Sequence, residues 1–250
     1  MRIFECSDYQ GMSRRAAGFI AAQITIKPDS VLGLATGSTP IGAYEQLAAW
    51  HKEGALSFAQ VKSVNLDEYR GLSGDHDQSY RYFMDTHLFR HVDIKRENTH
   101  VPDGLARDPA AECARYDRLV QDLGGVDLQL LGMGHNGHIG FNEPADHFVP
   151  GTNLVNLTAS TIEANKRFFA SQDDVPRQAL TMGIGTIMGA RKVLVVVSGA
   201  DKADIVRRAF YGPVTPQVPA SVLQLHPDVV LVGDQAALSG IPKEGVTLCG

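Results

Sequence analysis

The side chains best suited to chemistry lie in residues 128–144, LQLLGMGHNGHIGFNEP. A short apolar run, typical of a buried strand, leads into a glycine-rich loop that carries two imidazoles, two amides and a carboxylate. Ligands of an open α/β sheet bind at the carboxyl ends of its strands, and glycines let the backbone approach a ligand closely. A purely structural loop is the alternative, but this convergence of polar groups favours an active site. The residues concerned are His135, Asn136, His138, Asn142 and Glu143.

The same loop contains a dinucleotide-binding pattern that its surroundings do not support. Gly132, Gly134 and Gly137 match G-x-G-x-x-G after the predicted strand. That fingerprint requires a following helix and an acidic residue about 20 positions later. Pro144 and Pro150 interrupt the next stretch, and no carboxylate stands at the required distance. We therefore expect no nicotinamide or flavin cofactor.

A metal site is the second alternative for this loop. His135, His138 and Glu143 offer imidazole and carboxylate ligands. Histidine pairs that bind metals are better placed at i, i+4 on a helix or on rigid strands than at this i, i+3 spacing. We therefore expect no metal.

A second motif, Thr36-Gly37-Ser38-Thr39-Pro40, joins a predicted strand to a predicted helix. A glycine turn with hydroxyls at a helix N-terminus presents N–H groups and a positive dipole to an anion. The motif lacks the G-K-[ST] ending of an ATP-binding loop, so it suits a single phosphate. The structural alternative is that Ser38 or Thr39 only caps the helix.

A third motif, Asn65-Leu66-Asp67-Glu68-Tyr69, ends the next predicted strand. Two adjacent carboxylates there point to different sides, so one can enter a site while the other is structural. A carboxylate in a partly dry pocket has a raised pKa and can move a proton at carbon. A turn or helix-capping role is the alternative for both.

Two separated cations complete the candidates. Lys202 follows a predicted strand and lies at the same sheet edge as the other motifs, although a lone lysine is usually a surface residue. Arg167 lies in residues 144–180, a stretch of weak periodicity that is either an active-site lid or an ordinary surface excursion. From the lid, its guanidinium would bind a phosphate with bidentate geometry.

Strands and helices must alternate along the chain to bring these motifs together. Strands rich in Val and Leu, alternating with helices, predict a Rossmann-like open α/β sheet that is mostly parallel and covered on both faces, in three layers. We expect residues 1–250 to form one domain. The predicted strands are 31–36, 61–66, 98–101, 126–132, 191–199 and 228–234, and the predicted helices are 40–52, 79–89, 108–125, 200–212 and 219–227.

Composition excludes several classes of protein. The 250 residues are 44% hydrophobic with a net charge of −5, which suits a globular chain without a nucleic-acid or anionic-membrane surface. No apolar run is long enough for a membrane span, and no leader opens the chain. Cys6, Cys113 and Cys249 are far apart and odd in number, so we expect reduced thiols in a cytoplasmic protein.

Four segments in the right order closely resemble the glucosamine-6-phosphate deaminase (isomerase) family: LGLATGSTPIGAYEQL, VNLDEYRGL, LLGMGHNGHIGFNEP and LQLHP. The resemblance covers residues 1 to about 240. It implies conversion of glucosamine 6-phosphate and water into fructose 6-phosphate and ammonia, with no cofactor. It also implies that His138 opens the sugar ring, that Glu143 and Asn136 tune its imidazole, and that Asp67 moves a proton from C2 to C1. The implied phosphate-binding residues are Gly37, Ser38, Thr39, Arg167 and Lys202.

Two features suggest how this chain differs from other family members. Some members have aspartate where this chain has Asn136, and because an amide adds no negative charge beside His138, we expect a different pH dependence. Allosteric members bind an activating sugar phosphate just after N-E-P through basic residues. Here that stretch, ADHFVPGTNLVNL, has no Lys or Arg, and Asp146 would repel phosphate. We therefore expect hyperbolic kinetics.

Three other functions are alternatives on this sequence. A 6-phosphogluconolactonase would need a base acting on water, and a ribose-phosphate-type isomerase would release no ammonia. A sugar-phosphate sensor of the transcription-regulator type would need a DNA-binding domain, for which the residues before the first predicted strand leave no room. The sequence does not decide between a monomer and a homo-oligomer.

Overall fold

The computed structural model describes residues 1–166, 169 and 171–249. Within them, one eight-stranded sheet contains only parallel neighbours. Its strands are β1 (Arg2–Cys6), β2 (Val31–Leu34), β3 (Lys62–Asn65), β5 (Thr99–His100), β6 (Leu128–Leu131), β9 (Val193–Val197), β10 (Val229–Asp234) and β11 (Val246–Leu248). The order across the sheet is β11-β1-β10-β9-β6-β2-β3-β5. The predicted open, parallel α/β sheet is confirmed.

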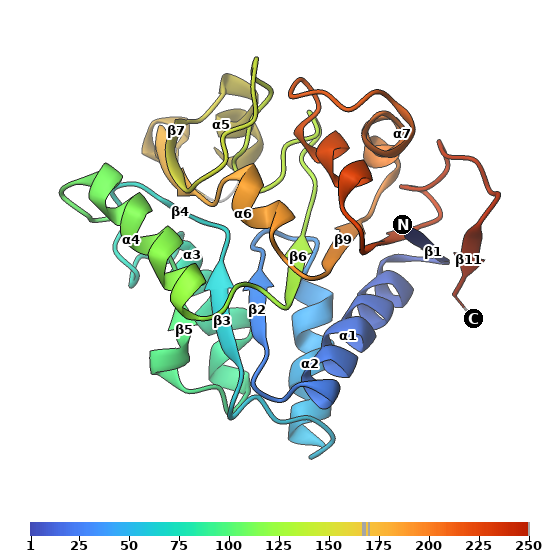
Figure 1. Ribbon diagram of the computed structural model, residues 1–250, viewed down its shortest axis with the longest axis horizontal. Helices are drawn as coiled ribbons and strands as arrows, with labels where there is room; N and C mark the ends of the chain where they lie inside the picture. Colours follow the sequence, from blue (N-terminus) through green and yellow to red (C-terminus); the bar gives the residue numbers. More distant parts are fainter. Residues whose placement is uncertain (167–168, 170, 250) are drawn as a thin grey trace.

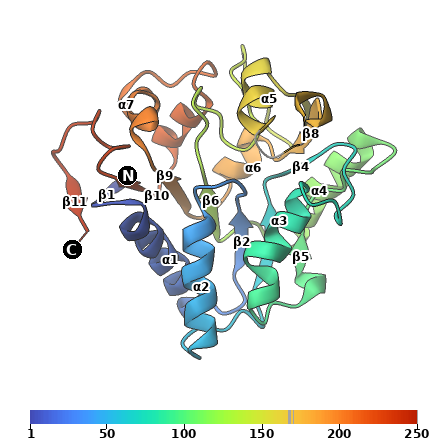
Figure 2. The same cartoon turned by 180° about the vertical axis from the view of Figure 1, so that it is seen from behind.

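Helices cover both faces of this sheet, as a parallel sheet requires. In Figure 1, α4 (Pro109–Asp122) and α6 (Ile184–Met188) lie in front of it. In Figure 2, turned by 180°, α1 (Tyr9–Ile26), α2 (Ile41–Lys52) and α3 (Tyr80–His87) lie in front. The described part of the chain also contains the helices α5 (Ala159–Asn165) and α7 (Ala203–Tyr211) and the 3₁₀ turns Phe89–His91, Arg96–Asn98, Gln172–Asp174, Ala200–Lys202 and Pro219–Leu225. No helix in the described part of the chain is both long and apolar enough to cross a membrane.

Burial on both faces explains the composition of the central strands. Every residue of β9 (VLVVV) and of β10 (VVLVGD) is buried. Helix α1 begins where the Asp8 side chain accepts a hydrogen bond from Gly11 N at 2.8 Å. Its residues Met12, Ala16 and Ile20, spaced by four, are fully buried against the sheet. The three layers therefore share one apolar core.

A second, three-stranded antiparallel sheet lies above the carboxyl ends of the parallel strands, where Figure 1 shows β7 and α5. It consists of β4 (Asp67–Tyr69), β8 (Gln178–Thr181) and β7 (Asn153–Asn156). A separate apolar cluster under it includes Tyr69, Phe141, Leu157, Ile162 and Val175. Much of residues 144–180 is therefore ordered in a small layer that faces the end of the main sheet.

The structure differs from the predicted elements at both ends of the chain. Residues before the strand predicted at 31–36 form β1 and α1, and β1 lies inside the sheet between β11 and β10. After the predicted strand 228–234 the chain forms one more strand, β11, at the sheet edge, which was not predicted from the sequence. The predicted helix 219–227 is the 3₁₀ segment Pro219–Leu225. Strand β1 (RIFEC) contains two charged residues, and β11 (VTL) has only three residues, so neither forms a continuous apolar run that marks a strand in the sequence.

The expectation of three reduced thiols is wrong for two of them. Cys6 and Cys249 form a disulfide, with their Cα atoms 4.8 Å apart, and Cys113 is free and buried. The two cysteines are separated by 243 residues. Only the parallel pairing of β1 with β11 brings them together, so sequence spacing could not indicate the bond.

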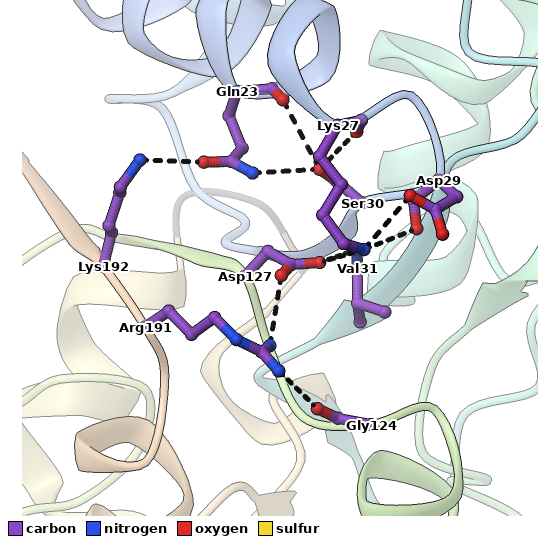
Figure 3. A network of polar contacts seen from close by, with 9 residues as sticks. All are labelled: Gln23, Lys27, Asp29, Ser30, Val31, Gly124, Asp127, Arg191 and Lys192. Carbon is purple, nitrogen blue, oxygen red and sulfur yellow. Dashed lines mark hydrogen bonds and ion pairs between the residues drawn. The ribbon is translucent and has the colours of Figure 1, made fainter.

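A polar network holds the opposite, amino-terminal edge of the sheet (Figure 3). Asp127, which directly precedes β6, is 3% exposed. Its carboxylate accepts hydrogen bonds from Val31 N at 2.8 Å, Lys27 Nζ at 2.9 Å and Arg191 at 3.1 Å. One side chain therefore joins the end of α1 to the starts of β2, β6 and β9.

Candidate active site

A cavity of about 390 Å³ opens at the carboxyl ends of β2, β3 and β6. It brings together the three sequence motifs, which are far apart in the chain. A larger cavity of about 480 Å³ lies against α1 and is lined by Arg14, Arg15, Phe19 and Trp50, none of which belongs to these motifs. The residues lining the first cavity include Thr36, Gly37, Ser38, Thr39, Asp67, Tyr80, Asn136, His138, Phe141, Thr161, Asn165 and Lys202.

The loop between β2 and α2 forms one wall of this cavity. Gly37 has φ of +97°, a backbone conformation that side chains other than glycine disfavour. Helix α2 has Pro40 as its N-cap and no side-chain capping bond, so Ser38 and Thr39 do not cap it. Tyr9 Oη donates to Ser38 O at 3.1 Å and accepts from Gly42 N at 2.9 Å, which fixes the loop against α1. The hydroxyls of Ser38 and Thr39 are therefore not used in capping α2 and can bind an anion at the cavity.

Asp67 and Glu68 lie on opposite faces of β4. Asp67, 6% exposed, faces the cavity. The Glu68 carboxylate instead accepts hydrogen bonds from the backbone N–H groups of Tyr69, Tyr80 and Arg81, at 2.8, 2.9 and 3.0 Å. Glu68 thereby holds the start of α3, and Asp67 is the carboxylate available to a ligand.

Burial sets the protonation of both carboxylates. It raises the pKa of Asp67 well above the ordinary value of 3.8, and the negative charge of Glu68 raises it further. Burial also raises the pKa of Glu68, to about 7, although three backbone N–H donors oppose the shift. A carboxyl group whose pKa is nearer to neutrality is a more effective proton acceptor in general base catalysis.

The glycine-rich loop after β6 positions His138. A side chain on Gly134 would place its Cβ 2.3 Å from Cε1 and Nε2 of His138, so the imidazole occupies the space that this glycine leaves. His138 Nδ1 lies 3.4 Å from Glu143 Oε2. This is an ion-pair contact rather than an aligned hydrogen bond, since Nδ1 has no hydrogen-bond partner among the described residues. Such contacts are often long without substrate and tighten when it binds.

Glu143 is held by several donors. Asn136 Nδ2 donates to Oε2 at 2.6 Å, while Thr161 donates to Oε1. Burial alone would raise the pKa of Glu143, but His138, Thr161 and Asn136 outweigh it and lower the pKa to about 2. Glu143 is therefore a carboxylate throughout the neutral range and can stabilise a positive charge on His138.

Of the two cations expected from the sequence, Lys202 lies at the cavity. Its Nζ donates to Met133 O at 3.0 Å, and the residue stands at the start of α7. Arg167, expected to bind phosphate from a lid, lies outside the described residues.

The cofactor motifs in the loop do not form the corresponding sites. No helix follows β6 before β7, as the dinucleotide fingerprint would require. His135 Nε2 pairs with Asp201 Oδ2 at 2.5 Å rather than with His138 and Glu143. Within the described ranges, no group of three or more His, Cys, Asp or Glu side chains has the arrangement of a metal site.

The lining residues that the sequence reasoning missed include two aromatic and two polar side chains. Tyr80 and Phe141 stack with their ring centroids 5.9 Å apart and form an aromatic wall beside Asp67. Phe141 could have been noticed, because it stands inside G-F-N-E-P. Thr161 and Asn165 lie on α5, inside the stretch 144–180 that was considered as a lid, but nothing in the sequence singled out these two residues.

Comparison with known proteins identifies the family of this chain. The family model for glucosamine-6-phosphate isomerases/6-phosphogluconolactonase matches residues 8–231. The chain is 58% identical to a glucosamine-6-phosphate deaminase of Lachnoclostridium phytofermentans over 93% of this chain and 98% of that protein. It is 55% identical to a glucosamine-6-phosphate deaminase of Clostridium perfringens over 95% and 98% of the two chains.

Solved structures give the same relationship. A monomeric glucosamine-6-phosphate deaminase superposes with a TM-score of 0.94 at 47% identity, covering 96% of this chain and 100% of that one. A 6-phosphogluconolactonase of Leishmania guyanensis, at 22% identity and a TM-score of 0.73 over 96% and 98% of the two chains, shares the fold alone. The chain therefore belongs to the glucosamine-6-phosphate isomerase/6-phosphogluconolactonase family.

Proposed function

We infer that this protein is a glucosamine-6-phosphate deaminase, which converts glucosamine 6-phosphate and water into fructose 6-phosphate and ammonia. The observation that carries this inference is that Asp67, His138 and the loop Gly37–Thr39 line the same cavity. It combines a base for a carbon acid, an imidazole and an anion site, which together suit a phosphorylated sugar. The full-length similarity to deaminases at more than half identity supports the same reaction.

In this proposal, His138 moves the proton that opens the pyranose ring. Ionised Glu143 stabilises the imidazolium that forms, and the contact of 3.4 Å between Nδ1 and Oε2 supports this pairing. Asn136 links the two residues, since its Nδ2 donates to the Glu143 carboxylate and its Oδ1 accepts from the backbone N–H of His138 at 3.1 Å.

Asp67 is proposed as the base that takes the proton from C2 of the open sugar and returns it at C1. Its burial and raised pKa support this role, because proton abstraction from carbon needs a well-placed base that is not fully solvated. The electron pair of the C2–H bond forms a C1–C2 double bond, and the C1 carbonyl oxygen accepts the displaced pair and a proton. Protonation at C1 then leaves an imine at C2, to which water adds, and the 2-amino group leaves as ammonia.

The phosphate is proposed to bind at Gly37, Ser38, Thr39 and Lys202. Two observations support this assignment. The Ser38 and Thr39 hydroxyls do not cap α2, and the Lys202 ammonium lies at the same cavity. Arg167 remains a predicted partner of the phosphate.

We further propose that residues 1–250 act as one domain with residues 144–180 as a lid over the site, and that the protein is a monomer. The positions of Thr161 and Asn165 at the cavity support the lid. The similarity to a deaminase that is monomeric supports the oligomeric state. Size-exclusion chromatography with light scattering should give a mass near 27.0 kDa, and a dimer mass would contradict this proposal.

The test of function is the release of ammonia and fructose 6-phosphate from glucosamine 6-phosphate, with and without EDTA. We expect equal amounts of both products and no effect of EDTA. Asp67→Asn should lower kcat by roughly 10²- to 10⁴-fold, the usual contribution of a general base. Asp75→Asn, at an exposed aspartate away from the cavity, is the matched control.

Two outcomes would contradict the proposal. If the folded wild-type protein releases no ammonia but hydrolyses 6-phosphogluconolactone, it is a lactonase. If it binds glucosamine 6-phosphate without turnover, it is a sensor.

A further inference from the structure

We propose that Thr161 is a positioning residue for this reaction, whose hydroxyl on α5 fixes the orientation of the Glu143 carboxylate toward His138. The inference rests on the proposed function and adds to it a residue outside the recognised motifs. It concerns α5, whereas His138 and Glu143 both come from the loop after β6.

The contacts of Glu143 divide cleanly between its two oxygens. Oε1 accepts from Thr161 Oγ1, which in turn accepts from Thr158 Oγ1 at 3.0 Å. Thr158 Oγ1 also lies 3.3 Å from Oε1. Oε2 faces Asn136 Nδ2 at 2.6 Å and His138 Nδ1 at 3.4 Å. Helix α5 therefore holds Oε1, and Oε2 faces the imidazole of His138.

This division matters because the last torsion of a glutamate side chain is broad. Rotation about the bond to the carboxylate has no sharp staggered minimum, so hydrogen bonds must set its angle. Without a donor at Oε1, the carboxylate can turn and lose its alignment with His138. Small errors in the placement of catalytic groups cost large factors in rate.

Thr161 is better suited to a test than Thr158. Thr161 is 4% exposed, so water does not readily replace its hydroxyl. Thr158 is also the N-cap of α5, and its hydroxyl accepts from Thr161 N. Substitution of Thr158 would therefore change the helix start as well as Glu143.

The experiment measures kcat and KM for ammonia release by the full-length protein and a set of variants. Thr161→Val keeps the shape and removes the donor, and we expect about a tenfold lower kcat with KM changed less than about twofold, as for a lost hydrogen bond to a charged group. Thr161→Ser keeps the hydroxyl and should stay within about threefold of wild type. Thr161→Ala tests the same loss should valine impair folding.

A double-mutant cycle tests whether Thr161 acts through Glu143. In a Glu143→Gln background, Thr161→Val should lower kcat by less than about twofold, because residues that act in series are not additive. Thr86→Val is the matched control: its hydroxyl is buried in α3 and has no hydrogen-bond partner among the described residues. This variant should keep wild-type kcat.

Three results would overturn the inference: a wild-type kcat in Thr161→Val and Thr161→Ala, no rescue by Thr161→Ser, or an undiminished loss in the Glu143→Gln background. Each of them leaves the deaminase function intact, since the wild-type protein is assayed in parallel. Absence of ammonia from the wild type would instead overturn the proposed function.

Discussion

Asp67 and Glu68 are neighbours in the chain, yet their carboxylates have different surroundings. Three backbone N–H groups hold Glu68, while Asp67 is buried at the cavity. The alternation of side chains along β4 separates them. Both residues offer a carboxylate that could act as a base, but only the surroundings of Asp67 leave its carboxylate accessible to a ligand.

Asn136 offers a test of the same principle beside His138. Its Nδ2 donates to Glu143 Oε2 at 2.6 Å. Asn136→Asp replaces this donor with a second negatively charged oxygen, which favours a proton on the neighbouring imidazole. The pKa of Glu143, now held at about 2 partly by Asn136, should rise as well. We therefore expect the acidic limb of the profile of kcat/KM against pH to move to higher pH, by roughly one unit.

The measurement is kcat/KM between about pH 5 and 9, the range around the ordinary imidazole titration. Asn156→Asp is the matched control, because Asn156 is an exposed residue of β7 outside the cavity. Its profile should match that of the wild type. An unshifted acidic limb in Asn136→Asp would contradict the proposed influence of charge on His138.

The loop after β6 shows how an element positions a side chain. Gly134 has no positive φ, so its role is not backbone freedom. Instead, the missing side chain leaves room for the His138 imidazole, which would otherwise lie 2.3 Å from a new Cβ. The same loop contains the apparent dinucleotide fingerprint, so glycine spacing alone did not distinguish a phosphate cradle from a packing requirement.

Gly134→Ala should therefore displace the imidazole and lower kcat by roughly 10²-fold, as expected for a misplacement of about 1 Å. The thermal unfolding temperature should change little, since the loop lies at the surface of the cavity. Gly18→Ala, at a helix position where a new Cβ meets no atom within 4 Å, serves as the comparison and should retain activity. Wild-type kcat in Gly134→Ala would show that the loop accommodates the methyl group without moving His138.

At the scale of the whole molecule, the two edges of the sheet have separate tasks. The carboxyl edge carries the cavity, while Asp127 joins several elements at the amino edge (Figure 3). The polar residues around Asp127 therefore contribute to stability, while those around the cavity contribute to the proposed reaction. A substitution at one edge should affect one property and spare the other.

Asp127→Ala should lower the free energy of unfolding by about 2 to 3 kcal/mol, because it leaves the buried Val31 N–H without its acceptor and separates two cations from their partner. Exposure of Lys27 and Arg191 to water limits the loss. Urea denaturation measures it, and kcat should stay at the wild-type value. Asp228→Ala, which breaks the exposed pair with Arg2, should cost less than about 1 kcal/mol. An equal loss of unfolding free energy in Asp127→Ala and Asp228→Ala would contradict the proposed difference between the buried network and the exposed ion pair.

The parallel sheet and the motifs at its carboxyl edge could be predicted from the order of residues alone. Continuous apolar strands such as β9 (VLVVV) and well-capped helices carry local signals. Asp108, for example, caps α4 just before Pro109, as its sequence predicts. Parallel strands also place their carboxyl ends at one edge, so Ser38, Asp67 and His138 could be expected to meet.

Only the tertiary structure decided the features that depend on contacts between distant, short segments. The three-stranded upper sheet, the approach of Thr161 to Glu143 and the Cys6–Cys249 bond all join residues whose local sequence carries no mark of their partner. Short strands and single hydroxyls have too little periodicity to predict pairing. Their positions follow from the packing of the folded core, which brings Cys6 next to Cys249 and Thr161 next to Glu143.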